Sequence, residues 1–352
     1  MISKTINSYN SEYYDKKLSD LLPLITIGIT CFNAEKTIDK ALKSAFEQDW
    51  PNLEIILIND GSTDGSKYII DSWLLMKKNI IAINNTCNMG CAKARNIIIS
   101  KSQGEFIAFF DDDDISRKDR VRLQYEATLK YEKKHSTQLI ACFASGKRIY
   151  NNGYIKNFCA AGVKGKAPIG LQMANYLLFF DQKKGVSYGS GVPTCSLFAR
   201  TSIFSKLGGF DVELRRQEDI DFGIRLAMQG AHFIGIEESV ITQYATSGID
   251  KSALIEFQSA DYLINKYAKY LNSKGLYKYM KLWIKIRYAH FNSNELIAFL
   301  ILIKLFIRYP VRTLFHFFKS AYKRLIHEKL MNSSAKNIIL LTKCVKFLNR
   351  IF

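Results

Sequence analysis

The first 150 residues alternate between short apolar runs and stretches in which apolar positions recur at a helical period. The apolar runs predict four β-strands: Leu24–Thr30, Leu53–Asn59, Ile80–Asn84 and Phe106–Phe110. Their apolarity is continuous, which is typical of strands covered on both faces in a parallel sheet. Residues 38–46 between the first two runs predict a helix with one apolar face on that sheet. The pattern predicts an α/β fold with an open, mixed but mostly parallel sheet flanked by helices.

Capping residues predict where two further helices begin. The Ser62–Asp64 segment can cap a helix that runs through Lys78. Ser116 and Asp119 match a capping box, which predicts a helix near Arg117–Lys133.

The regularity weakens after about Asn151. The segment Asn151–Pro168 is rich in Gly, Lys and Asn and predicts a mobile loop, whereas Gln217–Gly230 predicts a helix and His232–Ile236 a short strand. From about Lys251 the chain is helical in pattern, aromatic and basic. We therefore expect a lead-in over residues 1–22, an α/β domain over 23–250 and a helical basic region over 251–352.

Charge is distributed unevenly over the 352 residues. The formal net charge is +18, and residues 275–352 contain fifteen Lys and Arg against only Glu295 and Glu328. A basic block at one end of a chain suggests a local negative partner. At 48% hydrophobic residues, the composition is that of a globular protein and not of a disordered one.

The cysteines and the N-terminal segment provide information on the cellular compartment of the protein. The seven cysteines are scattered without a C-x-x-C pair, so neither a disulfide framework nor a zinc site is predicted. The segment MISKTINSYNSEYYDKK lacks the apolar run of a signal peptide. We expect a cytoplasmic location.

The most apolar stretch is Leu296–Ile307 (LIAFLILIKLFI). With twelve residues and Lys304 inside, it is shorter than the ~20 residues that span a bilayer as a helix. The following RYPVRTLFHFFKSAYKRL mixes aromatic and basic residues, as in segments that lie in the interface of anionic membranes. We expect peripheral docking at the cytosolic face of the cell membrane, with a solvated basic helical bundle as the alternative. Nucleic acid is not expected, because no nucleic-acid motif accompanies the charge.

Polar clusters follow all four predicted strands. They are Thr30–Glu35 (TCFNAE), Asn59–Asp64 (NDGSTD), Asn88–Asn96 (NMGCAKARN) and Asp111–Asp114 (DDDD). Ligands of open α/β sheets bind outside the carboxyl ends of the strands, so these clusters would converge on one rim. Adjacent carboxylates beside a buried strand repel one another and raise their pKa values, which a divalent cation such as Mg²⁺ or Mn²⁺ would relieve. The alternative is a solvated acidic turn that caps the next helix, a role that Asp114 alone also fits.

The four clusters with their preceding strands, together with GGFDVELRRQEDIDFGIRLAMQG, resemble glycosyltransferase family 2, whose fold is GT-A. The resemblance runs from about Pro23 to Tyr244. It implies an inverting, metal-dependent enzyme that moves a sugar from a nucleotide diphosphate, with a UDP-sugar as the expected donor. The acceptor would be a hydroxyl on a lipid-linked or growing surface glycan, as in polysaccharide, O-antigen or capsule biosynthesis.

The resemblance assigns donor-binding residues to the strand ends: Thr30, Phe32, Glu35, Asp60, Lys93, Arg95, Asp111 and Asp112. Among these, Asp60 would accept a hydrogen bond from the base, and Lys93 and Arg95 would face the nucleotide. A basic helix surface is the alternative for Lys93 and Arg95.

The resemblance also places the metal and the catalytic acids. Asp111–Asp113 corresponds to the D-x-D motif, in which Asp113 would ligate the metal and Asp111 would contact ribose, the metal or a metal-bound water. Glu218 and Asp219 begin a predicted helix, whose N-terminus favours ionised carboxylates. Asp219 would take the proton from the acceptor hydroxyl. A helix cap with a surface acid is the alternative.

One departure concerns the segment Ile241–Ser247, which contains no histidine where many relatives carry one. Gln243 or Tyr244 is expected to substitute at the diphosphate. A different class of function, a non-catalytic nucleotide-sugar or membrane-binding module with a degenerate site, stays open. A dinucleotide-dependent oxidoreductase is not favoured, because no G-x-G-x-x-G follows the first strand.

Overall fold

The computed structural model describes residues 22–245, 252–317, 322–331 and 333. Among them, nine strands form one sheet in the order β3-β2-β1-β4-β8-β6-β9-β5, with β7 paired to β6. The strands are β1 (Ile25–Cys31), β2 (Leu53–Asn59), β3 (Ile80–Asn84), β4 (Phe106–Asp111), β5 (Asp114–Ser116), β6 (Ile140–Ile149), β7 (Ile155–Phe158), β8 (Leu197–Arg200) and β9 (His232–Tyr244).

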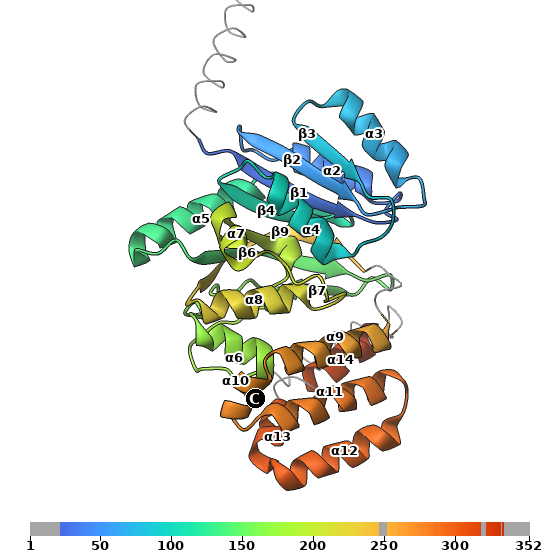
Figure 1. The fold of residues 1–352 in the computed structure, drawn as a ribbon, viewed down its shortest axis with the longest axis vertical. Helices are drawn as coiled ribbons and strands as arrows, with labels where there is room; N and C mark the ends of the chain where they lie inside the picture. Colours follow the sequence, from blue (N-terminus) through green and yellow to red (C-terminus); the bar gives the residue numbers. More distant parts are fainter. Residues whose placement is uncertain (1–21, 246–251, 318–321, 332, 334–352) are drawn as a thin grey trace, which may run out of the picture.

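Helices cover both faces of the sheet, and further helices gather at one end of the molecule (Figure 1). The sheet helices are α2 (Ile38–Phe46), α3 (Ser66–Met76), α4 (Cys91–Lys101), α5 (Arg120–His135), α6 (Leu171–Phe179), α7 (Thr201–Leu207) and α8 (Glu218–Met228), with a 3-10 turn η1 (Thr194–Ser196) before β8. The end helices are α9 (Ala253–Lys266), α10 (Ala268–Ser273), α11 (Tyr277–Phe291), α12 (Glu295–Arg308), α13 (Pro310–His316) and α14 (Tyr322–Met331). In Figure 1 they lie opposite α3, with α6 and α8 between them and the sheet.

The predicted mixed α/β sheet is confirmed, and its first four strands lie within one residue of the predicted bounds. β1 is parallel to both β2 and β4, and β2 is parallel to β3. The register pairs Thr30 with Asp111 and Cys31 with Asn59, so the polar ends of these strands meet at one edge. β8, β7 and β5 are antiparallel to their partners, and β6 runs parallel to β9.

Three local predictions are wrong. Ser116 does not cap α5: it lies on β5 and its Oγ accepts from the Arg120 guanidinium at 2.9 Å, while Asp119 pairs with Arg117. The predicted loop Asn151–Pro168 contains β7, because these residues hydrogen-bond to the edge of β6. β9 continues past Ile236 to Tyr244, since bulges in β9 opposite Ala144–Gly146 keep the two strands paired.

The predicted helical C-terminal region is confirmed, since most of the described residues after Ser252 lie in α9 to α14. A single core cluster joins α6 and α8 to these helices through Leu263, Tyr267, Trp283 and Leu305. The division near residue 250 stays a prediction; it falls in 246–251, outside the described residues, as does nearly all of the 1–22 lead-in. Within the described part of the chain, no helix has both the length and the apolarity to cross a bilayer.

Candidate active site

The loops after β1 and β2 are held together by main-chain donors. Asn33 has a left-handed φ of 51°, and its N–H donates to Ser62 Oγ at 3.0 Å. The Gly65 N–H donates to Glu35 Oε2 at 2.9 Å. These bonds fix a polar pocket edge beside Thr30, whose Oγ1 lies 3.8 Å from the Cys91 sulfur.

The β1 loop also reaches the aspartate turn. The Phe32 N–H donates to Asp112 Oδ2 at 2.9 Å, and the Phe32 side chain is 37% exposed. The predicted nucleoside-pocket residues Thr30, Phe32 and Glu35 are thus brought together with Asp112 at the rim.

Asp60 is buried and holds the loop after β3. Its carboxylate accepts from Asn85 Nδ2 at 2.7 Å, from the Met89 N–H at 3.0 and 3.1 Å, and from the Gly90 N–H at 2.8 Å. A carboxylate offers about four acceptor positions. A nucleotide base would therefore have to share one of these oxygens.

Arg95 on α4 connects the two predicted halves of the site. Its Nη1 lies 2.6 Å from Glu218 Oε1, and its Nη2 lies 3.6 Å from Asp111 Oδ1. The Arg95 side chain is only 7% exposed, whereas Lys93 is exposed on the same helix. Arg95 therefore connects the end of β4 to the start of α8 through these two contacts.

The four aspartates after β4 have unequal surroundings. Burial raises the pKa of Asp112 to about 8, although the Phe32 N–H opposes the shift. Burial and then Asp111 raise the pKa of Asp114 to about 7. The pKa of Asp111 is also raised by burial, against the pull of Arg95. Concentrated, desolvated carboxylates of this kind favour a divalent cation.

One group of possible ligand atoms lies close together: Asp111, Asp114 and the Cys195 sulfur, all within 4.8 Å of one another. Burial holds the pKa of Cys195 well above its usual value, so the thiol stays neutral and the two carboxylates carry the charge. That donor set fits a hard cation such as Mg²⁺ or Mn²⁺. Asp114 is buried on β5 and is not a solvated cap. No sequence motif pointed to Cys195, which lies in η1.

Gln243 on β9 contacts two members of this group, Asp114 and Cys195. Its Nε2 donates to Asp114 Oδ2 at 2.8 Å and lies 3.2 Å from the Cys195 sulfur, while its Oε1 accepts from Arg148 at 2.8 Å. Tyr244 next to it is 43% exposed.

Asp219 lies in the first turn of α8. Gln217 enters that helix with a φ of 67°, which turns the chain sharply before Glu218. Burial, and then Glu218, raise the pKa of Asp219 to about 7, against the pull of Arg95. A carboxylate with this pKa suits general base catalysis near neutral pH.

Parallel strands with polar ends, an aspartate turn and an acidic helix start form one rim. A family model matches the part of the chain that contains the strands and the aspartate turn. The family model described as Glycosyl transferase family 2 matches residues 26–203. The chain belongs to this family.

Named relatives agree with that assignment. An uncharacterized glycosyltransferase of Haemophilus influenzae is 38% identical over 31% of this chain and 44% of its own length. The Escherichia coli protein WfaP, a UDP-Glc:alpha-D-GlcNAc-diphosphoundecaprenol beta-1,3-glucosyltransferase, is 28% identical over 58% of this chain and 70% of its own. The chain thus matches less than half the length of the Haemophilus relative.

The fold is similar to a solved glycosyltransferase structure. Residues 1–349 of S. aureus TarS in complex with UDP-GlcNAc superpose with a TM-score of 0.51 at 17% identity, covering 83% of this chain and 86% of that one. The GT-A fold predicted for this family 2 member is confirmed.

Two buried charges that the sequence reasoning missed support the rim of this family 2 member. Arg120 is fully buried and donates to Ser116 Oγ, Gln124 Oε1 and the carbonyl oxygens of Phe109 and Cys195. It therefore joins β4, β5 and η1 directly beneath the aspartates.

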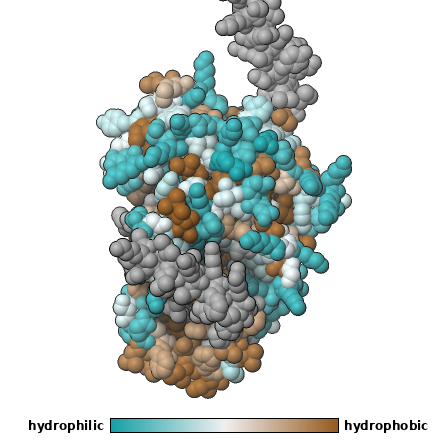
Figure 2. All heavy atoms as spheres, turned by 180° about the vertical axis from the view of Figure 1, so that it is seen from behind, coloured by the Kyte–Doolittle hydropathy of each residue, from teal (hydrophilic) through white to brown (hydrophobic). Residues whose placement is uncertain are grey.

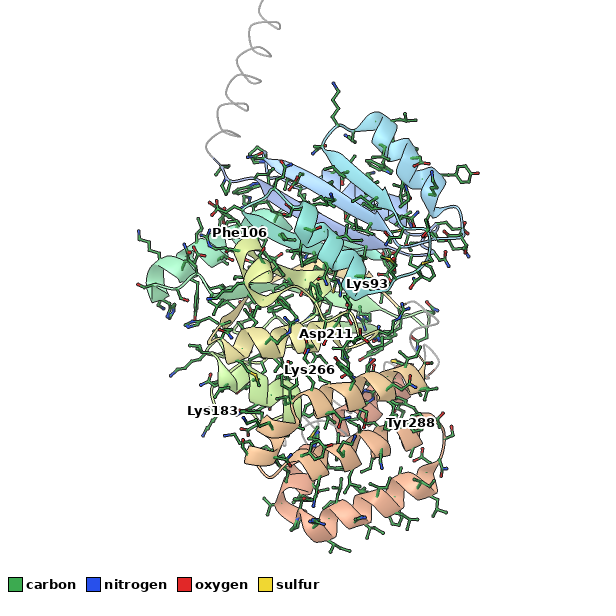
Figure 3. The ribbon with its side chains drawn as sticks, viewed as in Figure 1. Lys93, Phe106, Lys183, Asp211, Lys266 and Tyr288 are labelled. Atoms are coloured by element: carbon green, nitrogen blue, oxygen red, sulfur yellow. The ribbon has the colours of Figure 1, made fainter. Side chains whose placement is uncertain are left out.

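Asp221 anchors α8 to α9. It is fully buried and accepts from Arg225, Lys266 and Tyr267 at 2.7–2.8 Å. Lys266 also lies 2.5 Å from Asp211, and Figure 3 shows the two side chains between the sheet and the end helices. The acidic helix start is thus fixed relative to the C-terminal helices.

Proposed function

We propose that this protein is an inverting glycosyltransferase that moves a sugar from a UDP-sugar to a hydroxyl of a lipid-linked or growing surface glycan. The observation that carries the proposal is the Arg95 bridge, which sets Glu218 and Asp219 beside the Asp111 turn. The printed activity of WfaP, which uses UDP-Glc and a lipid-linked acceptor, supports the choice of substrates.

The donor would lie along the strand ends. Thr30, Phe32 and Glu35 would line the nucleoside pocket, and Asp112 holds Phe32 in place through its main chain. Asp60 would reach the base while it supports the β3 loop. Lys93, exposed above the rim, would approach the phosphates together with Arg95.

A Mn²⁺ or Mg²⁺ ion would be held by Asp111 and Asp113, with Asp114 and Gln243 beside it. When bound, such an ion supplies positive charge that offsets the charge of the leaving diphosphate.

Asp219 would act as the general base. Its carboxylate accepts the proton of the acceptor hydroxyl while the hydroxyl oxygen attacks the anomeric carbon and the bond to the nucleoside diphosphate breaks. Attack from the face opposite the leaving group inverts the configuration. Arg95 keeps Glu218 paired, so that Glu218 does not compete for the same proton.

The test combines thermal shift with an assay of UDP release. We expect UDP with Mn²⁺ to raise the melting temperature of the wild type, the Asp113→Ala variant to lose this shift, and Asp71→Ala to keep it, since Asp71 pairs with Lys67 on exposed α3. Absence of stabilisation by any nucleoside diphosphate would refute the proposal. Binding without release of UDP from UDP-sugars, even with acceptor present, would favour the non-catalytic module.

We also propose that α12 and α13 lie on an anionic membrane surface at the cytosolic face. The support is a set of nine exposed large apolar side chains: Leu296, Ile297, Phe299, Leu300, Ile303, Ile307, Val311, Leu314 and Phe315. Figure 2 shows apolar surface gathered at this end of the molecule. Exposed Lys304 and Arg308 lie among them. Continuous exposed apolar surface with basic neighbours is typical of interfacial membrane binding.

Co-sedimentation with phosphatidylglycerol vesicles at low salt tests the membrane proposal. The double variant Leu300→Glu/Ile307→Glu should stay in the supernatant. Leu75→Glu, a change at a 91% exposed leucine on α3, should sediment like the wild type. Equal sedimentation of all three proteins would contradict the proposed surface.

A further inference from the structure

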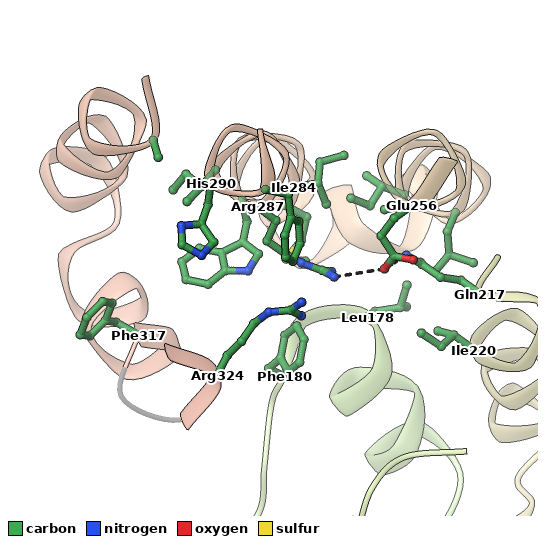
Figure 4. Close-up of a pocket in the computed structure, with 18 of the residues that line it drawn as sticks. Leu178, Phe180, Gln217, Ile220, Glu256, Ile284, Arg287, His290, Phe317 and Arg324 are labelled. Carbon is green, nitrogen blue, oxygen red and sulfur yellow. Dashed lines mark hydrogen bonds and ion pairs between the residues drawn. The ribbon is translucent and has the colours of Figure 1, made fainter. Parts of the chain in front are cut away.

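A cavity of about 840 Å³ lies between α6, α8 and the C-terminal helices, as judged from the described residues. Ligand sites commonly measure about 300–1,000 Å³, so this space is large enough for a substantial ligand. Figure 4 shows it between the side chains of α8, α9, α11 and α14. Much of its wall is apolar, including Leu178, Ile220, Ile284 and Leu302.

The cavity reaches the exposed apolar surface of α12. Phe299 lines the cavity and is also 59% exposed. An apolar chain inside the cavity could therefore continue onto the proposed membrane-facing surface without crossing a polar layer.

The carboxylates around the cavity already have ion-pair or hydrogen-bond partners. Glu256 lies 3.1 Å from Arg287, the pair marked in Figure 4. Glu295 and Glu328 both contact the His290 ring, at 3.1 and 3.0 Å.

The cations Lys156 and Arg324 line one wall, and a third cation of the same cluster, Arg148, lies beside them outside the cavity lining. Arg148 on β6 and Lys156 on β7 stand directly opposite each other in the antiparallel register, an unfavourable position for like charges. Arg324 is close enough that it and Arg148 both depress the pKa of Lys156, after burial. Arg324 pairs with Glu328, while Arg148 and Lys156 have no carboxylate partner among the described residues.

His327 adds a buried polar atom to this cluster. Its Nε2 lies 3.1 Å from the Tyr150 hydroxyl, while its Nδ1 is buried with no hydrogen-bond partner within the described structure. Burial and the neighbouring cations lower its pKa to about 4, so the ring is neutral at pH 7. Like-charged side chains around an unsatisfied buried nitrogen indicate that an anion completes the cluster.

The cluster and the cavity both adjoin the rim. Gln217 and Ile220, on either side of the Glu218–Asp219 pair, line the cavity. Arg148 also donates to Gln243, which donates to Asp114. A ligand in the cavity would thus end beside the proposed general base.

We propose that this cavity is the acceptor site and that it binds a lipid phosphate, with its apolar chain between α6, α9, α11 and α12 and its phosphate on Lys156 and Arg324. This inference rests on the proposed transferase function. It adds the place where a lipid-linked acceptor binds and the residues that recognise it. The chain enters from the α12 surface, and the glycan on the phosphate extends towards Asp219.

Three soluble probes separate the parts of such a lipid: farnesyl diphosphate, farnesol and inorganic pyrophosphate. Affinity for the full-length protein is measured by calorimetry with EDTA present, so that the metal-dependent donor site does not take up the diphosphate. We expect farnesyl diphosphate to bind at least about tenfold more tightly than either fragment. Equal binding of farnesol would overturn the phosphate assignment, and equal binding of pyrophosphate would overturn the lipid assignment.

Charge variants test the residues. Lys156→Gln and Arg324→Gln should each weaken farnesyl diphosphate binding about tenfold, because each removes a charged contact to phosphate. Lys285→Gln removes an exposed charge on α11 away from the cavity lining and should leave binding unchanged. Equal affinity in all three variants would refute the inference.

The thermal-shift measurement with UDP and Mn²⁺ distinguishes failure of the acceptor-site inference from failure of the transferase proposal. If UDP with Mn²⁺ stabilises the protein but farnesyl diphosphate does not bind, the acceptor inference fails and the transferase proposal stands. If UDP does not bind either, the transferase proposal itself fails.

Discussion

The Arg95 bridge offers the sharpest test of the site, because one side chain supports two carboxylates. In Arg95→Met the chain length is nearly kept, while Glu218 and Asp111 lose their shared cation. The three side chains are only 7%, 12% and 31% exposed, so water compensates little. Breaking a buried ion pair from one side costs about 3–5 kcal/mol. We expect a decrease of that size in the free energy of unfolding.

Urea unfolding of the metal-free protein measures this effect, and a surface arginine provides the control. Arg122 also contacts two carboxylates, Asp49 and Glu126, but its side chain is 38% exposed. Exposed pairs contribute about 0–1 kcal/mol, so Arg122→Met should change stability by no more than that.

A double-mutant cycle with Glu218→Gln tests whether the loss of unfolding free energy comes from the Arg95–Glu218 ion pair. Glu218→Gln alone leaves Arg95 with Asp111, while the Arg95→Met/Glu218→Gln protein no longer contains an unpaired Glu218. The two changes should therefore couple by about 1–3 kcal/mol. If Arg95→Met is no more destabilising than Arg122→Met, or the coupling is absent, the bridge does not hold β4 and α8 together.

Three further outcomes follow from the same geometry. Because burial raises the pKa of Asp219 to about 7, the base is protonated below that pH, so kcat/KM for transfer should fall about tenfold from pH 6 to pH 5 and be flat in Asp219→Asn. Tyr267→Phe removes one of three donors to the buried Asp221 and should lower the free energy of unfolding by about 1–3 kcal/mol in urea titration. Gly61→Ala places a Cβ 2.4 Å from a main-chain carbon of the loop after β3 at a φ of +72°. It should abolish UDP stabilisation in thermal shift, whereas Gly153→Ala, at a φ of +81° with open space around it, should not.

The part of the fold that the sequence predicts well is the part governed by local pattern. β1, β2 and β4 are largely buried on both faces, so each appears as a continuous apolar run, and a polar residue marks where each leaves the core. Parallel pairing then brings Thr30 beside Asp111 without further information. For this reason the rim and its aspartates were predictable from the chain alone.

The remainder of the site depends on pairing between distant residues. Asp114 meets Gln243 because β5 is antiparallel to β9, and nothing local to either segment encodes that register. Arg120 lies next to a residue that matched a capping pattern, but tertiary partners on β4 and η1 determine its role. In the same way, Asp119 pairs with Arg117 and leaves α5 without a side-chain cap. Local motifs are weak where a nearby charge offers a stronger partner.

The position of α8 explains why the C-terminal helices matter to a site built from the sheet. Its first turn carries Asp219, and two residues further on Asp221 is fixed to Lys266 and Tyr267 of the α9 region. Before the helix, Gln217 donates to Glu256 at 3.0 Å, and Glu256 pairs with Arg287 at the cavity wall. The proposed base is therefore held from the sheet side by Arg95 and from the cavity side by α9. The residues on either side of the Glu218–Asp219 pair, Gln217 and Ile220, line the cavity, so the proposed acceptor site and the proposed base share α8.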